Sequence, residues 1–161
     1  MSAAISKITY ANNITLITLA DLPCDSAVVA SVLSAFAQAQ VDVDMISQTA
    51  PQGGEMRLSF TISDESLGDA LTILGGLRKE HPSIKPEVLP GNCKLGFFDA
   101  GMFHCPGVAA DVFSTLSGAG IQMELITTSE VDISLLVAAH YATDALRLVE
   151  QVYGTTPVES V

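Results

Sequence analysis

The chain has few basic side chains and no long apolar run. Seven Lys and Arg stand against 18 Asp and Glu in 161 residues, which gives a net charge of -11. Because so acidic a chain repels phosphate backbones and anionic lipid, we expect neither nucleic acid nor membrane as a partner. No stretch reaches the roughly 18 apolar residues that a membrane span needs. The N-terminus also lacks the basic and then apolar pattern of a secretion signal, so we expect a cytoplasmic protein.

Sequence patterns of metal sites, disulfide frameworks and common catalytic motifs are also missing. The cysteines form no CxxC pair, and the three histidines are dispersed; the cysteines are Cys24, Cys93 and Cys105. The sequence has no GxxxxGK[ST] loop, HExxH or GxSxG. We therefore predict no metal ligand, no cofactor and no catalytic residue.

The sequence does contain an internal repeat, and 48% of its residues are apolar, enough for a packed core. In each half, strand-like alternation and helical i, i+3, i+4 spacing follow in the order strand, helix, strand, strand, helix. The predicted strands are 14–20, 41–45, 56–62 and 84–89 in the first half, and 95–98, 121–125 and 131–137 in the second. The predicted helices surround Val29–Phe36, Leu67–Leu74, Ala109–Leu116 and Ala145–Val152. A shift of 80 residues superimposes the two halves, which predicts two copies of one α+β unit.

The second copy lacks a final strand, since residues 154–157 are turn material. The strand-like N-terminal segment 4–10 precedes the first copy and has no role in it. We therefore predict a first domain over 13–90 and a second over 93–154 that is completed by the strand 4–10. Residues 155–161 are left as a tail. The alternative is a frayed N-terminus.

Local motifs resemble the regulatory region of aspartate kinases. Residues 100–110, 119–121 and 126–131 are similar to the second regulatory domain of that family, and residues 41–48 to the first. The resemblance covers residues 4–153. It implies two ACT domains in tandem, which are ferredoxin-like βαββαβ modules with antiparallel sheets and helices on one face. Chains of this size also resemble the separate small regulatory subunit of some bacterial aspartate kinases.

This resemblance implies a regulatory function in amino-acid biosynthesis. The family's catalytic domain opens with Lys-Phe-Gly-Gly-Thr, which does not occur here, so we do not expect this chain to be an enzyme by itself. The implied partners are a free amino acid effector, usually lysine or threonine, a kinase catalytic subunit and a second copy in a homodimer. Two alternatives are a dimerisation module with a degenerate ligand site and a fragment that needs a catalytic chain in trans.

In the first copy, the resemblance places candidate ligand-binding residues after the first strand. The family's Asp-Arg-Pro-Gly aligns with residues 24–27, so it is replaced here, leaving Asp25, Ser26 and Ala27 at a helix start. Free amides there can hold a carboxylate, but a capping side chain would compete with it. Gln48 stands where the family has an effector-binding glutamine, and Thr49 replaces the asparagine that follows.

In the second copy, two short motifs match the family. Pro106 and Gly107, followed by Val108, keep its Pro-Gly, and residues 128–130 match its Thr-Ser-Glu; these last residues are Thr128, Ser129 and Glu130. The alternative is that both motifs only shape turns.

Both copies also carry an aspartate where the family usually has glycine at the end of the first strand. These residues, Asp21 and Asp99, could receive an ammonium group, or they could be solvated carboxylates at strand ends.

Overall fold

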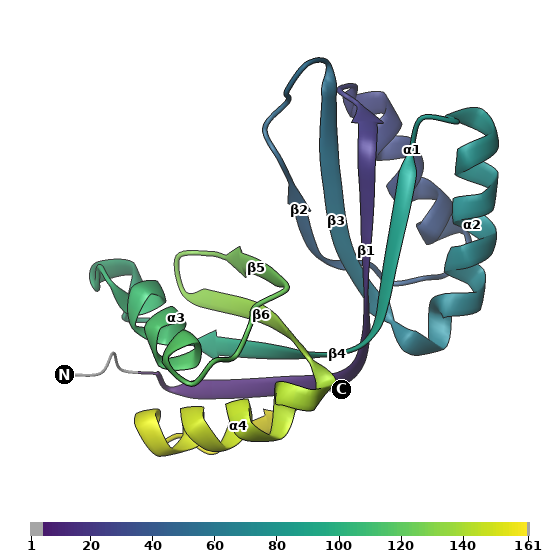
Figure 1. Cartoon of the computed structure of the whole chain (residues 1–161). Helices are drawn as coiled ribbons and strands as arrows, with labels where there is room; N and C mark the ends of the chain where they lie inside the picture. Colours follow the sequence, from purple (N-terminus) through teal and green to yellow (C-terminus); the bar gives the residue numbers. More distant parts are fainter. Residues whose placement is uncertain (1–4, 161) are drawn as a thin grey trace. The chain divides into compact units, whose positions relative to one another are not determined.

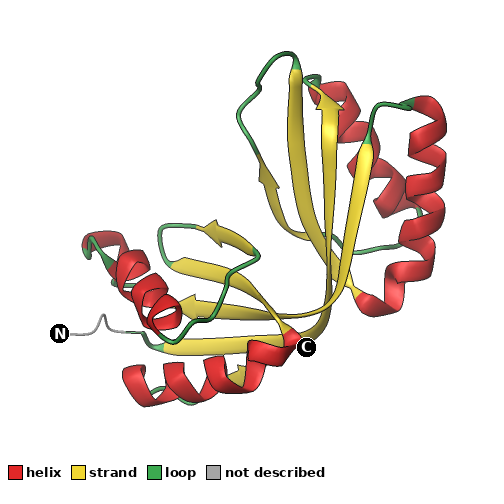
Figure 2. Ribbon diagram, in the orientation of Figure 1, coloured by secondary structure: helices red, strands yellow, loops and turns green. Residues whose placement is uncertain are grey.

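The computed structural model describes residues 5–160, which form two compact units (Figures 1 and 2). The central unit comprises residues 13–90. The composite unit combines the N-terminal residues up to Asn12 with the chain from Gly91 onward. Two long strands, β1 (Lys7–Pro23) and β4 (Lys85–Phe98), contribute one part to each unit.

The central unit is an antiparallel sheet with two helices on one side (Figure 2). Its other elements are α1 (Ser26–Gln38), β2 (Asp44–Gln48), β3 (Glu55–Ser63), the short 3-10 helix η1 (Asp64–Ser66) and α2 (Leu67–Glu80). The strand order is β2-β3-β1-β4. The apolar faces of α1 and α2 cover the sheet, and Phe36 meets Phe60 at its centre with ring centroids 5.0 Å apart.

Three details of the predicted central unit are wrong. The second strand begins at Asp44 rather than at 41, because Val41 is buried without joining the hydrogen-bonded ladder. Helix α2 continues to Glu80, and its buried stripe is Ala70, Leu74 and Leu77 rather than the predicted Leu67, Ala70, Leu71 and Leu74, since Leu71 is 54% exposed. Strand β4 does not end before Gly91, since the positive φ of this glycine (74°) lets the strand turn and continue.

The composite unit repeats the same strand order. Its other elements are the short 3-10 helix η2 (Met102–His104), α3 (Val108–Gly118), β5 (Leu125–Thr128), β6 (Asp132–Ala138), α4 (Ala139–Tyr153) and β7 (Val158–Glu159). Its strands are arranged β5-β6-β4-β1. Gly154 ends α4 in the left-handed conformation, as predicted. The predicted α+β class is confirmed, with helices packed on one face of each sheet.

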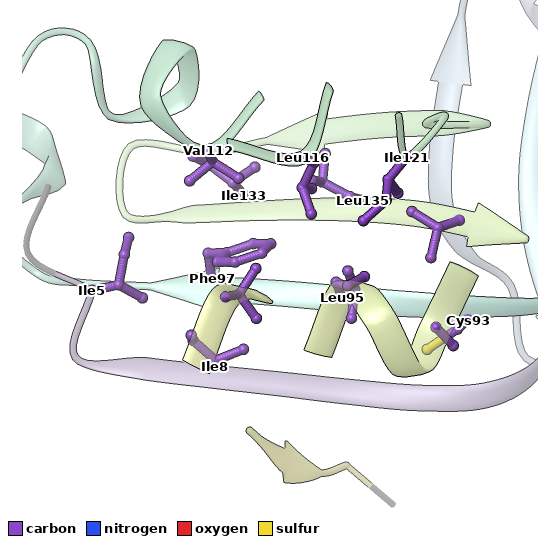
Figure 3. Packing of buried hydrophobic residues seen from close by; sticks show 14 of the residues in the cluster. Ile5, Ile8, Cys93, Leu95, Phe97, Val112, Leu116, Ile121, Ile133 and Leu135 are labelled. Atoms are coloured by element: carbon purple, nitrogen blue, oxygen red, sulfur yellow. The ribbon is translucent and has the colours of Figure 1, made fainter. Parts of the chain in front are cut away.

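The N-terminal part of β1 belongs to the composite core. The N–H of Ser6 donates to the carbonyl of Phe98 (3.1 Å), and Ile5 and Ile8 are buried beside Phe97 (Figure 3). Residue 4, the start of the predicted strand, lies outside the described residues. These contacts bring together segments that are about 90 residues apart in the sequence.

The segment expected as a tail forms β7, which pairs in parallel with β1. The Thr155 hydroxyl donates to the carbonyl of Ile5 (2.7 Å), and the N–H of Ser160 donates to the carbonyl of Tyr10 (2.8 Å). Residue 161 lies outside the described part. Within residues 5–160, no helix is long and apolar enough to cross a membrane.

Burial of Cys93 predicts a loss of stability in alkali. Desolvation raises the pKa of this thiol to about 11, from 9.0. The unfolded chain ionises first, so this stability is fully present below pH 9 and is lost as the pH rises to about 11, by about 3 kcal/mol at most. Urea unfolding at several pH values, compared between the parent and Cys93→Ala, measures this contribution. Equal pH dependence in the two proteins would contradict it.

Candidate functional site

A pocket of about 200 Å³ lies at the start of α3 in the composite unit. We call it the α3 pocket. It brings together two motifs that are 20 residues apart in the sequence, the start of α3 and the turn after β5. Of the predicted site residues, five line it: Gly107, Val108, Thr128, Ser129 and Glu130.

The N-terminus of α3 has no side-chain cap. Gly107 occupies the cap position with a φ of 100°, a conformation that favours glycine, and a glycine offers no side-chain cap to the first turn. The helical ladder begins with the N–H of Asp111 donating to the carbonyl of Gly107 (2.9 Å). The first-turn amides and the positive end of the helix dipole therefore form a favourable environment for a carboxylate. Pro106 is exposed and does not line the pocket.

The end of β5 and the turn after it also line the pocket. The Ser129 hydroxyl accepts from the N–H groups of Val131 (3.3 Å) and Asp132 (3.1 Å), so it shapes the turn. Thr128 and Glu130 are exposed, and the Glu130 carboxylate provides negative charge at the pocket. The pocket thus combines free amide donors with a carboxylate, the pair of groups that binds a zwitterion.

Asp99 does not line the α3 pocket. Its carboxylate accepts from the N–H of Gly101 (2.7 Å), and its own N–H donates to the carbonyl of Val131 (3.1 Å). Asp99 therefore stabilises the turn that leads from β4 towards η2.

The corresponding helix start in the central unit is already capped. Asp25 directly precedes Ser26, the first residue of α1. Its carboxylate accepts a hydrogen bond from the N–H of Ala27 (2.8 Å). The capping side chain that would compete with a ligand carboxylate is therefore in place here. Gln48 is exposed at the end of β2.

Asp21 and Thr49 line a larger hollow in the central unit, of about 400 Å³, with Arg57 and Glu55. Asp21 forms an ion pair with Lys85 (2.6 Å), and this hydrogen bond and charge raise the pKa of Lys85. The Thr49 hydroxyl accepts from the backbone N–H of Arg57 (2.9 Å). The Asp21 carboxylate is therefore already paired with the ammonium group of Lys85.

Comparisons with known proteins find an ACT domain and several aspartate kinases. An ACT domain model matches residues 99–153. The aspartokinase of Bacillus sp. (strain MGA3) is 28% identical over 148 residues, which cover 91% of this chain and 36% of the relative. The crystal structure of the regulatory subunit of aspartate kinase from Thermus thermophilus, in its ligand-free form, is 29% identical with a TM-score of 0.85. The alignment covers 94% of this chain and 99% of the Thermus thermophilus chain.

A crystal structure of aspartokinase alpha and beta subunits decides the family. One of its chains is 30% identical, with a TM-score of 0.83, and the alignment covers 94% of this chain and 99% of that one. The chain belongs to the aspartate kinase regulatory family. The resemblance in the sequence is thereby confirmed, as are the tandem ferredoxin-like fold and a regulatory role related to aspartate kinase.

The chain spans about a third of the length of the curated aspartokinases it matches. The ACT match begins at Asp99 and includes every residue of the α3 pocket. Sequence reasoning missed four lining residues, Met102, Cys105, Ala109 and Ile133. Alternation along 131–137 places Ile133 in the core but does not show that the core opens beside it.

Within residues 5–160, no three His, Cys, Asp or Glu side chains are placed to hold a metal ion.

Proposed function

We propose that the chain is a regulatory ACT pair that binds a free amino acid in the α3 pocket. The central and composite units each serve as one ACT domain. The observation that supports this most is that the uncapped start of α3 and Glu130 line the same pocket. The first-turn amides bind the α-carboxylate, Glu130 binds the α-ammonium group, and Met102 and Ile133 contact the side chain.

The pocket volume orders the ligands to be tested. About 200 Å³ is below the usual range of ligand pockets, which favours a small amino acid. Of lysine and threonine, the effectors that the family resemblance implies, threonine therefore comes first.

The regulatory effect requires a partner. This chain performs no catalysis by itself, and a kinase catalytic chain supplies the activity in trans. The ligand changes that activity only by binding one arrangement of the assembly more tightly than the other. A homodimer and a cytoplasmic location remain predictions from the sequence.

A second candidate function is supported by the central unit. Asp25 caps α1, and Lys85 pairs with Asp21, so the groups that would hold a ligand there are already engaged. The chain would then act mainly as a dimerisation module. This alternative predicts that no amino acid stabilises the protein.

A thermal-shift screen with the twenty amino acids distinguishes the two. A ligand at 100 times its dissociation constant adds about 2.7 kcal/mol of stability, which raises the melting temperature by several degrees. Glu130→Gln should abolish most of the shift, whereas the control Glu124→Gln should retain it, because Glu124 is exposed and outside the pocket. No shift with any amino acid contradicts the sensor function, and equal losses in both variants contradict the site.

A further inference from the structure

A second pocket lies on the face of the composite sheet that the helices do not cover. Along β4 and β6, Phe97 and Ile133 point into the core, so their neighbours Phe98 and Asp132 point to the opposite face. The pocket has a volume of about 290 Å³. It is lined by residues from β1, β4 and β6, namely Lys7, Thr9, Gly96, Phe98 and Asp132. We call it the sheet-face pocket.

Gly96 keeps the floor of the sheet-face pocket open. A Cβ atom at this position would lie 2.5 Å from the Thr9 hydroxyl oxygen, closer than real Cβ contacts. Any other residue would therefore displace Thr9 and fill the hollow.

Two opposite charges line the sheet-face pocket without pairing with each other. Among the described residues 5–160, neither the Lys7 ammonium nor the Asp132 carboxylate takes part in an ion pair. The hydroxyl of Ser134, which is 7% exposed, donates to Oδ2 of Asp132 (3.0 Å). This bond orients the carboxylate and leaves Oδ1 available for a ligand.

Charge and exposure define the chemistry of the occupant. The composite unit carries three Lys and Arg against eight Asp and Glu, so a ligand with only negative charge is repelled. Phe98 is 40% exposed and offers an apolar wall. We propose that the sheet-face pocket binds an α-amino acid with an apolar side chain. Its carboxylate pairs with Lys7, its ammonium group with Asp132, and its side chain packs on Phe98.

This site is independent of the α3 pocket, because no residue lines both. It also predicts a different ligand class, apolar rather than small and polar. The variants distinguish the two proposals: Glu130→Gln affects binding only at the α3 pocket, and Lys7→Gln and Asp132→Asn affect binding only at the sheet-face pocket.

Isothermal titration of the full chain with L-phenylalanine tests the proposal, since an aromatic ligand can pack edge-to-face on Phe98. We expect saturable binding that Lys7→Gln and Asp132→Asn each weaken at least about tenfold. Phenethylamine, which lacks the carboxylate, and 3-phenylpropanoate, which lacks the ammonium group, should each bind more weakly than the amino acid. Asp132→Asn keeps an acceptor for Ser134, and circular dichroism confirms that each variant is folded.

Two control variants locate the binding. Lys79→Gln removes an exposed cation from α2, and Glu130→Gln alters only the α3 pocket. Both should bind L-phenylalanine like the parent. The proposal is overturned by an absence of binding, by unchanged affinity in both Lys7→Gln and Asp132→Asn, or by loss of binding in Glu130→Gln.

Discussion

Replacing Ile8 with alanine should lower the free energy of unfolding by about 2–5 kcal/mol. Ile8 is 0% exposed and packs with Phe97 and Leu95 in the composite core (Figure 3). The substitution removes buried methyl and methylene groups and leaves a cavity that the neighbouring strands fill only in part. Urea unfolding followed by far-UV circular dichroism measures the change.

Lys7→Ala is the matched control for Ile8→Ala, because Lys7 is exposed and its side chain points to the other face of the same strand. We expect a change within about 0.5 kcal/mol. If the N-terminus were frayed, Ile8→Ala would be equally mild. Similar small effects of both substitutions would therefore contradict the incorporation of β1 into the composite unit.

Phe60→Ala should destabilise the central unit by about 3–5 kcal/mol. The ring is fully buried and meets Phe36 edge-to-face, at an interplanar angle of 78°. A double-mutant cycle with Phe36→Leu and Phe60→Leu should show a coupling of about 0.5–1.5 kcal/mol, because each single substitution already removes the aromatic pair. The same urea experiment gives all four stabilities.

The matched control is Phe103→Ala, which makes the same chemical change at a ring that is 57% exposed. Its effect should stay within about 0.5 kcal/mol. If Phe60→Ala were as mild as Phe103→Ala, the central core would not be packed as described.

Most elements of the fold could be predicted from apolar spacing, and the exceptions have physical reasons. The alternation of apolar and polar residues predicts which side chains are buried, and Val41 and Met45 are buried as predicted. Alternation does not report pairing, which begins only at Asp44. Pro90 and Gly91 are typical of a turn, yet here they lie within a strand that continues through both residues.

The candidate site shows a similar division. The motifs at 106–108 and 128–130, taken from the family resemblance, contain five of the nine residues that line the α3 pocket. The partners of individual carboxylates could not be predicted in this way. Lys85, the partner of Asp21, is 64 residues away in the sequence. The Asp99 carboxylate accepts a hydrogen bond from the N–H of Gly101. These contacts depend on three-dimensional placement, which spacing along one strand does not specify.

The short strand β7 has a consequence for the handling of this protein. A strand at the edge of a sheet presents unpaired N–H and carbonyl groups, which can recruit a strand from another molecule. By pairing with Thr9 and Tyr10, β7 covers part of this edge of the composite sheet. Removal of the last few residues would leave β1 as an uncovered template for edge-to-edge aggregation. Affinity tags and truncations are therefore safer when they leave residues 155–160 intact.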